Sequence, residues 1–332
     1  MKKKIMSLVL GATMLVGCFG LGGCGKNSGT SSDKGDTVEL SIAYQYGTAY
    51  APAIVMKEEG LIEKHYEEAT GKKVNVVWNQ MSSGADINTG ISSGSVDIGY
   101  MGIGPAVTGV SKNIGYKIFS GCSGQESGLM TNDKDVKSLK DLVGSSKQIA
   151  TVNIGSIQHI MLAKALADNG LDPHALDTNI VAMKHPDGKS AIESGSVACH
   201  LTSNPYIYME RDNADLTELE EVKNSWNVEN SFIVGVAANS LHDDNPELYK
   251  AVCDASAEAM DIINNTPEDA AKITCDLDGN SFEDELKYLQ LGYYSVETKG
   301  IFELAKFMED NDFVDDAPDS YNDLVFDNVK GD

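Results

Sequence analysis

The chain has 332 residues, of which 42% are hydrophobic and 23% are charged, an ordinary composition for globular domains. At roughly 150 residues per domain, this length predicts about two domains. Asp and Glu number 50 against 26 Lys and Arg, a formal net charge of −24. So acidic a chain repels phosphate backbones and anionic lipid headgroups, which argues against binding to nucleic acid or to a membrane surface.

The first residues have the pattern of an export signal. Lysines at positions 2–4 precede an apolar run at 5–23, and Cys24 follows it. The stretch 21–24 (LGGC) is similar to the lipobox of bacterial lipoproteins, which predicts a signal peptide at 1–23, a lipid anchor on Cys24 and a flexible tether at 24–37. The stretch 15–18 (LVGC) fits the same pattern at Cys18, but that site would leave Phe19 and Leu21 exposed. An uncleaved membrane helix is the other alternative, although this segment is only marginally long enough.

The remaining cysteines are Cys122, Cys199, Cys253 and Cys275. They form no CxxC pair, and no spacing of Cys and His is typical of a zinc site. An exported location permits a disulfide between Cys253 and Cys275, while buried free thiols are the favoured interpretation.

From residue 38 onward, short apolar runs alternate with helical patterns, which predicts an α/β fold with mostly parallel sheets. The first series has strands at 38–46, 73–78, 96–101 and 116–120, with helices at 51–70, 85–93 and 105–112. The second series has strands at 129–131, 148–152, 180–184 and 197–201, with helices at 138–143, 157–169 and 188–194. Each series is expected to form its own sheet.

Beyond residue 240 the pattern is helical alone, over 246–264, 267–275, 282–291 and 301–310. These helices need a sheet to cover. The economical topology has lobe 1 at 38–122 and 233–332, with lobe 2 at 123–232. The chain would cross to lobe 2 near 123 and return through a strand near 231–236.

Ligands of open α/β sheets bind beyond the carboxyl ends of the strands. The loops predicted there are small and polar: Gln45 and Tyr46 follow the first strand, Ser82 and Ser83 the second, and Gly102 the third. They offer hydroxyls and backbone N–H groups.

In the second series, the stretch 153–159 (NIGSIQH) opens a helix directly after a strand. Its free N–H groups and the positive end of the helix dipole would cradle an anion. Ser156 and His159 are the candidate side chains. The alternative is structural, with Ser156 only a helix cap and His159 a buried histidine with its hydrogen bonds satisfied.

An enzyme would need a nucleophile with a base, or paired carboxylates, at these loops. The loops contain almost no acidic residue, and there is neither a Gly-x-Ser-x-Gly motif nor a metal-ligand cluster. The sequence therefore predicts a binding protein with no cofactor and no metal.

Four stretches resemble a known family: 92–99 (SSGSVDIG), 138–144 (SLKDLVG), 155–159 (GSIQH) and 204–206 (NPY). With the lipobox and tether, they are similar to the solute-binding lipoproteins of ABC importers in the nitrate/sulfonate/taurine group, which includes relatives that bind thiamine pyrimidine precursors. The resemblance covers nearly the whole mature chain and implies a type 2 periplasmic-binding-protein fold, in which two α/β lobes joined by a hinge close on a ligand.

The resemblance also implies partners, location and contacts. The protein would be a monomer on the outer face of the bacterial cell membrane and would deliver its ligand to an ABC permease and, indirectly, to its ATPase. By position, the ligand would contact Gln45, Ser82 and Gly102 of lobe 1, Gln125 at the crossover, and Ser156, His159, Ser203 and Asn204 of lobe 2. Tyr46 and Tyr206 would pack on its apolar part.

The ligand class is narrowed by departures from the family. The single arginine, Arg211, falls in a helix after the Pro-Tyr motif, so a bidentate guanidinium clamp on a carboxylate is not expected. Nitrate-type relatives place a lysine near the return strand, where this chain has Asn230 and Ser231. A sulfonate such as an alkanesulfonate or taurine is therefore favoured over nitrate. The alternative is a thiamine-precursor pyrimidine or another aromatic heterocycle stacked on tyrosines.

Overall fold

The first sheet is built where the sequence predicts it. In the computed structural model, which describes residues 37–332 apart from the side chains of 276–278, this sheet has six strands. In spatial order they are β11 (Tyr293–Tyr294), β4 (Tyr116–Gly124), β10 (Ile233–Ala238), β3 (Ile98–Gly102), β1 (Val38–Tyr44) and β2 (Val74–Gln80). The predicted signal peptide and Cys24 lie outside the described residues, as does the tether up to residue 36.

The sheet is mixed rather than mostly parallel. β1 runs parallel to β2 and β3, whereas β10 is antiparallel to both of its neighbours, β3 and β4. The expectation of mostly parallel sheets is thus corrected. The physical reason is that the chain re-enters this sheet from the second one, at the edge where β3 and β4 end, so β10 has to run the opposite way.

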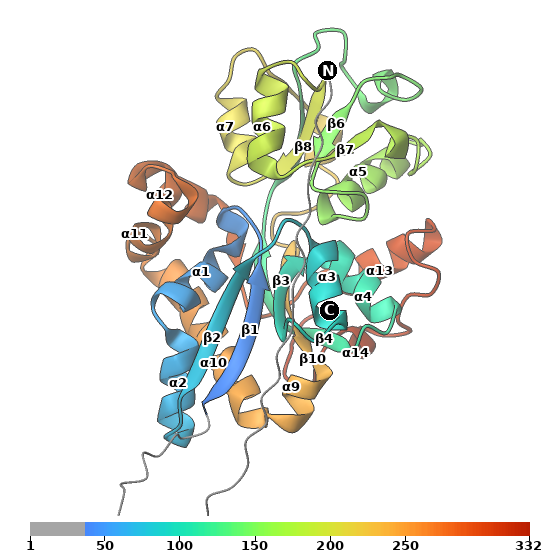
Figure 1. Ribbon diagram of the computed structural model, residues 1–332. Helices are drawn as coiled ribbons and strands as arrows, with labels where there is room; N and C mark the ends of the chain where they lie inside the picture. Colours follow the sequence, from blue (N-terminus) through green and yellow to red (C-terminus); the bar gives the residue numbers. More distant parts are fainter. Residues whose placement is uncertain (1–36) are drawn as a thin grey trace, which may run out of the picture. The chain divides into compact units, whose positions relative to one another are not determined.

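Helices cover both faces of the first sheet (Figure 1). One face carries α1 (Ala51–Glu58), α2 (Leu61–Thr70) and α10 (Pro246–Asn265), and the other carries α3 (Gly84–Ser92), α4 (Ile103–Ser111) and α13 (Ile301–Asp310). The remaining helices of this part are α9 (Asn239–Asp244), α11 (Pro267–Asp278), α12 (Phe282–Leu291) and α14 (Tyr321–Leu324). The helix predicted at 51–70 is divided because Gly60 adopts a left-handed conformation (φ 60°).

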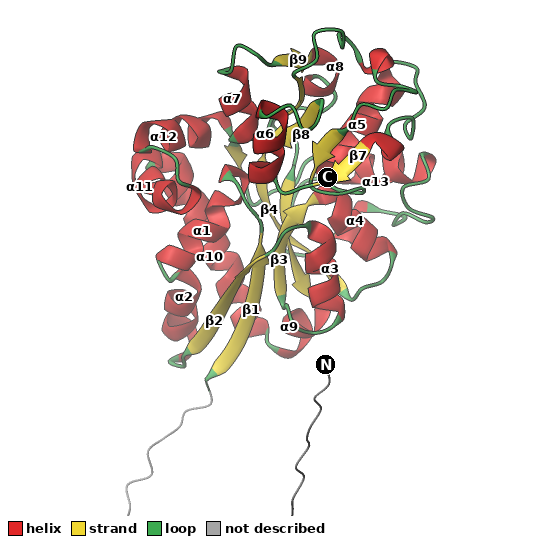
Figure 2. Ribbon diagram, turned by 45° about the horizontal axis from the view of Figure 1, so that its top comes forward, coloured by secondary structure: helices red, strands yellow, loops and turns green. Residues whose placement is uncertain are grey.

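The second sheet has five strands, in the order β7 (Ile180–Ala182), β6 (Ile149–Thr151), β8 (Cys199–Ser203), β5 (Ser127–Thr131) and β9 (Thr217–Leu219). Between helices drawn in red, Figure 2 shows these strands in yellow. Helices α5 (Ile157–Asp168) and α8 (Glu220–Lys223) cover one face, and α6 (His185–Glu193) and α7 (Tyr206–Arg211) cover the other. The helix predicted at 138–143 is a single short turn, Leu139–Asp141.

The chain crosses to the second sheet between β4 and β5 and returns between α8 and β10. The two sheets therefore correspond to the two predicted series, while the lobe boundaries assigned above stay predictions. Residues 37–332 belong to one compact unit.

Helix α5 of the second sheet packs against the first-sheet core. Ile157, Ile160 and Met161 belong to the same buried cluster as the first-sheet strands. This close approach needs glycine at Gly102, because a Cβ there would lie 2.6 Å from Ile157 Cγ2. The contact places the end of β3 directly beside the start of α5.

All four described cysteines are free thiols, so the optional pairing of Cys253 with Cys275 is not formed. Within residues 37–332, every helix is too short or too polar to traverse a bilayer.

Candidate ligand cavity

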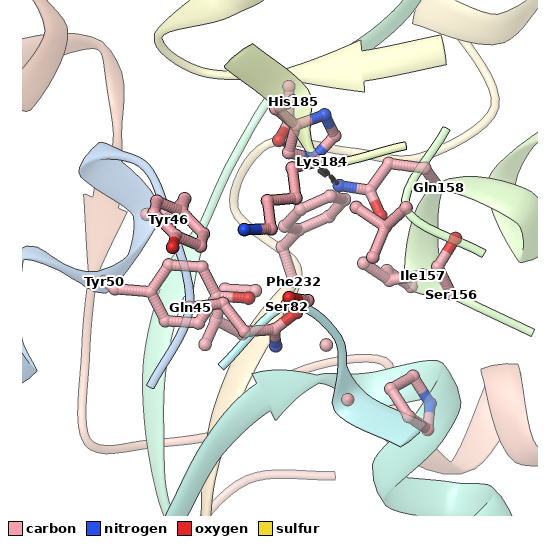
Figure 3. Close-up of a pocket in the computed structure, with 17 residues that line it drawn as sticks. Gln45, Tyr46, Tyr50, Ser82, Ser156, Ile157, Gln158, Lys184, His185 and Phe232 are labelled. Carbon is pink, nitrogen blue, oxygen red and sulfur yellow. Dashed lines mark hydrogen bonds between the residues drawn. The ribbon is translucent and has the colours of Figure 1, made fainter. Parts of the chain in front are cut away.

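The strand ends of both sheets surround one cavity (Figure 3). Its lining comes from the ends of β1, β2 and β3 with the segments after them and from the start of β10 on one side, and from the ends of β6, β7 and β8 with the segments after them on the other. The lining residues are Gln45, Tyr46, Ala49, Tyr50, Ser82, Gly84, Gly102, Pro105, Val152, Ser156, Ile157, Gln158, Lys184, His185, Ser203, Phe232 and Ile233. The position follows the rule that carboxyl ends of strands hold the ligand in open α/β folds.

One ammonium group reaches into this cavity. Lys184 follows β7, and its Nζ lies 5.4 Å from the ring centroid of Tyr46 on the opposite side. The open volume, counted as space for the centre of a water molecule, is about 20 Å³, room for roughly one water. A larger ligand therefore requires Lys184 to leave Tyr46 or the two sides to separate.

The start of α5 presents a capped helix end to the cavity. Ser156 is the N-cap, and its Oγ accepts a hydrogen bond from the backbone N–H of His159 at 3.3 Å. The backbone N–H groups of the first turn and the positive end of the helix dipole therefore lie at the cavity wall, where an anion is favoured.

His159 itself is turned away from the cavity. Its Nδ1 accepts from the backbone N–H of Gly155 at 2.9 Å, and its Nε2 donates to Asp177 Oδ1 at 2.8 Å. The side chain is 1% exposed and packs edge-on against Phe313. Because both ring nitrogens are used within the protein, the geometry supports the structural alternative for His159, as a residue that orders the loop before α5.

Two histidines are buried with different partners, His185 in the cavity wall and His200 behind it. His185 Nε2 lies 2.9 Å from the amide nitrogen of Gln158, and His185 Nδ1 lies 3.1 Å from Thr202 Oγ1. Burial, aided by the nearby His200, lowers the pKa of His185 to about 3. His185 is therefore a neutral hydrogen-bonding group at physiological pH, and it holds the side chain of Gln158.

His200 forms a second buried pair with Glu210. Its Nδ1 lies 2.5 Å from Glu210 Oε1, and both side chains are completely buried. Burial raises the pKa of Glu210 to about 8 and lowers the pKa of His200 to about 3. Since a charge on either group is costly in this interior, both groups favour their neutral forms, and the contact between them supports α7 against β8.

The structure brings together part of the predicted contact set. Gln45, Tyr46, Ser82, Gly102, Ser156 and Ser203 all line the cavity. Ser83 does not, because its hydroxyl caps α3, accepting from the backbone N–H of Asp86 at 3.1 Å. Tyr206 stacks on His185 behind the wall, with ring centroids 5.6 Å apart.

Gln125 and Asn204 bind each other instead of facing the cavity. Asn204 Nδ2 donates to Gln125 Oε1 and to the backbone oxygen of Tyr288 in α12, both at 2.8 Å. Gln125 lies on the crossover between β4 and β5, so this bridge fixes the crossover to the first-sheet side. As ligand contacts, these two residues have no support from the geometry.

Sequence reasoning missed Lys184, Gln158 and Phe232, whereas Tyr50 is one of the tyrosines that the aromatic alternative allows for stacking, and His185 flanks a predicted strand end without an assigned role. Lys184 carried a usable signal, because it ends the strand predicted at 180–184, where the strand-end rule places ligand groups. Gln158 lay inside the GSIQH motif but was overlooked beside the histidine. Phe232 reaches the cavity through tertiary packing, which no local pattern indicates.

Arg211 lies away from the cavity, as expected from its place in α7. Its Nε and Nη2 donate to Glu218 at 2.7 and 2.6 Å, and Nη1 donates to Glu126 at 2.7 Å. Across residues 37–332, His, Cys, Asp and Glu side chains form no cluster suited to a metal ion.

Comparison with known proteins finds a matching family and a similar binding protein. Residues 33–277 match the NMT1-like family. The chain is 27% identical to the taurine-binding periplasmic protein of Escherichia coli (strain K12) over 246 residues, 71% of this chain and 72% of that protein.

Solved structures show the same fold. The alkanesulfonate-binding protein SsuA from Xanthomonas axonopodis pv. citri, bound to MOPS, has a TM-score of 0.70 at 15% identity, covering 89% of this chain and 99% of that one. The aliphatic sulphonate binding protein SsuA from Escherichia coli has a TM-score of 0.65 at 19% identity, covering 89% and 94%. The predicted class, a two-lobed α/β periplasmic-binding-protein fold, is confirmed.

Proposed function

Because the chain belongs to the NMT1-like family, we propose that it is an extracytoplasmic solute-binding protein of an ABC importer and that its ligand is a small sulfonate-type oxyanion. The observation that carries this proposal is Lys184, whose ammonium reaches into a cavity lined, among the described residues, by no aspartate or glutamate. The chain as a whole has a net charge of −24, but the charged side chain of this cavity is a cation. A cavity of positive charge favours an anionic ligand.

The neutral groups of the cavity suit the same ligand. Ser156, Ser203 and Ser82 supply hydroxyls, and the first turn of α5 supplies backbone N–H groups. A sulfonate has three oxygens that accept hydrogen bonds from different directions, and donors here come from both sides of the cavity. The similarity to a taurine-binding protein and to an alkanesulfonate-binding protein supports this ligand class.

Ligand binding would close the two lobes on each other, and no reaction would be catalysed. Within residues 37–332, the chain passes between the sheets only at the β4–β5 and α8–β10 connections, which would form the hinge of a two-lobed receptor. The closed, loaded receptor would dock on a membrane permease, and no covalent bond would change. We further propose that Cys24, which is outside the described residues, carries the lipid that anchors the receptor.

A second candidate ligand, a pyrimidine or other aromatic heterocycle, has one observation in its favour. The rings of Tyr46, Tyr50 and Phe232 all line the cavity. A flat ligand inserted beside Tyr46 would take the place that the Lys184 ammonium now occupies. The two candidates differ in charge, so direct binding measurements separate them.

The test is a calorimetric titration of the chain from residue 25 onward with methanesulfonate, taurine, nitrate and a thiamine-precursor pyrimidine, beside a thermal-shift series. A sulfonate should bind and raise the melting temperature by mass action, and it should be recovered unaltered. Binding of the pyrimidine alone would replace the oxyanion by the aromatic ligand. A ligand recovered chemically changed would overturn the receptor function in favour of an enzyme.

A further inference from the structure

The side-chain amide of Gln158 decides whether one wall of the cavity offers a hydrogen-bond donor or an acceptor. In the structure the amide nitrogen Nε2 is the end that lies 2.9 Å from His185 Nε2 and 3.5 Å from Ser203 Oγ. The other end, the amide oxygen, points away from His185 (Figure 3). An amide nitrogen and an amide oxygen have nearly the same shape, so the surrounding hydrogen bonds determine which of them faces the ligand.

His185 links this amide to a buried hydroxyl. Its ring is neutral, because burial lowers its pKa to about 3, and a neutral imidazole has one donor and one acceptor nitrogen. If Nδ1 carries the proton, it donates to Thr202 Oγ1, Nε2 accepts from the amide NH₂, and the amide oxygen faces the cavity. If Nε2 carries the proton, it donates to the amide oxygen and the NH₂ group faces the cavity.

The hydroxyl of Thr202 decides between these two arrangements. Thr202 is 0% exposed, and among the described residues its hydroxyl has a single partner, His185 Nδ1 at 3.1 Å. In the first arrangement its own O–H would be a buried donor without an acceptor. An unpaired buried donor costs more than an unfilled lone pair, so Thr202 donates to Nδ1 and the proton of the ring resides on Nε2.

Ser203 favours the same arrangement. Its Oγ is buried beside the amide end that faces His185. When that end is the amide oxygen, the Ser203 hydroxyl can donate to it, although at 3.5 Å the bond is weak. Both buried hydroxyls then have acceptors.

We propose that Thr202, acting through the Nε2–H tautomer of His185, turns the Gln158 amide over from the orientation drawn in Figure 3, so that its NH₂ group faces the cavity as an oxyanion donor. Thr202 and His185 are positioning residues, and Gln158 is the ligand contact. The role in ligand binding rests on the proposed function, since it assigns a donor to the oxyanion beside Lys184. The tautomer itself is a property of the ligand-free protein and is tested without any ligand.

The first experiment is ¹⁵N NMR of the histidine rings in the ligand-free chain from residue 25, with the His185 signals assigned by their loss in His185→Gln. Neutral imidazole tautomers have distinct ¹⁵N shifts and couplings. We expect Nε2–H with unprotonated Nδ1, unchanged between pH 5 and 8 because the pKa is about 3. An Nδ1–H tautomer, or an imidazolium in this range, overturns the proposal.

The second experiment removes the hydroxyl and keeps the shape. Thr202→Val should weaken binding of methanesulfonate about tenfold, the loss of one hydrogen bond to a charged ligand, and should release His185 from the Nε2–H tautomer. The matched control is Thr151→Val on the adjacent strand β6, because Thr151 is equally buried and its hydroxyl has no partner. This control should keep both the affinity and the tautomer, and equal behaviour of the two variants would contradict the positioning role.

The experiments test the proposed function and the positioning role of Thr202 and His185 separately. A wild-type chain that binds no sulfonate overturns the proposed function, while the NMR measurement still decides the orientation of Gln158. A chain that binds sulfonate with an Nδ1–H tautomer keeps the proposed function and overturns only the positioning role.

Discussion

Lys184 is the residue whose charge should matter most to the ligand. Replacing it by methionine keeps the length and apolar stem of the side chain but removes the ammonium that faces Tyr46. We expect Lys184→Met to weaken methanesulfonate binding by about 1.5–3 kcal/mol, the usual contribution of a hydrogen bond to a charged group. Calorimetry measures this, with Lys164→Met as the control, because Lys164 lies on α5 and pairs there with Asp168. Equal affinities of the two variants would remove Lys184 from the binding site.

Ser156 and His159 belong to one motif but should behave differently when substituted. Ser156 lines the cavity and caps α5, so Ser156→Ala should lower both sulfonate affinity and the free energy of unfolding, the latter by about 1 kcal/mol. His159→Phe leaves the Gly155 N–H and Asp177 without their ring partner, so it should lower stability with little change in affinity. Denaturant unfolding and calorimetry on both variants separate the two effects, and a selective loss of affinity in His159→Phe would restore His159 as a contact.

For single residues, the sequence predicts which loops meet at the cavity but not which of their side chains point into it. Gln45, Ser82, Gly102 and Ser203 lie at the cavity because strand ends converge there. The orientation of Asn204 depends on a carbonyl of α12, which is distant in the sequence. Such tertiary hydrogen bonds leave no local pattern.

Gly102, at the end of β3 and the start of α4, contacts the start of α5. Substitutions at Gly102 test how closely the two sides of the cavity must approach each other. A Cβ on Gly102 would lie 2.6 Å from Ile157 Cγ2, too close for the present packing. Gly102→Ala should therefore push the start of α5 away, lower ligand affinity and increase the radius of gyration in small-angle scattering. Ile157→Gly in the same chain removes both obstructing atoms, Cγ2 and the Cβ that would lie 2.7 Å away, and should restore part of the affinity; no recovery would mean that the glycine serves another purpose.

Most elements follow from periodicity, and the exceptions have identifiable causes. The C-terminal helices at 282–291 and 301–310 were predicted with their observed bounds, since each has a clear amphipathic repeat. The helix at 51–70 was predicted as one because the apolar pattern continues through Gly60. The antiparallel direction of β10 was not foreseen, because strand direction depends on how the whole chain returns from the second sheet.

Across the whole molecule, the two sides are joined at opposite flanks of the cavity. On one flank, Asn204 binds the carbonyl of Tyr288 and Tyr208 stacks on the Tyr288 ring, with centroids 6.0 Å apart. On the other flank, His174 stacks on Phe313 at 4.4 Å and its Nε2 lies 2.7 Å from the backbone oxygen of Asn311. Opening the cavity therefore requires at least one of these contacts to break.

The contact made by His174 should depend on pH. Both of its ring nitrogens face acceptors, since Nδ1 lies 2.8 Å from Asp177 Oδ2 and Nε2 faces the oxygen of Asn311. Only an imidazolium donates to both. Burial alone lowers the pKa of His174, but the hydrogen bonds to Asp177 and Asn311, with the charges of Asp177 and Asp172, outweigh it and raise the pKa above its ordinary value. Asp310, the last residue of α13, and Asp312 adjoin Asn311 in the sequence.

A folded-state pKa above the unfolded value of about 6.5 means that this stabilisation is complete below pH 6.5 and is lost as the pH rises through the folded-state pKa. The free energy of unfolding of the wild type should therefore fall over this interval. His174→Phe keeps a ring against Phe313 but cannot titrate, so urea unfolding at a series of pH values should show a smaller decline. Subtracting the variant's free energy of unfolding from that of the wild type at each pH removes the contribution of the other histidines. If the two free energies change in parallel with pH, His174 does not make the contact on this flank depend on pH. Because the same contact spans the cavity, ligand-free wild type should also open more readily at higher pH, which small-angle scattering detects as a rise in radius of gyration absent from the variant.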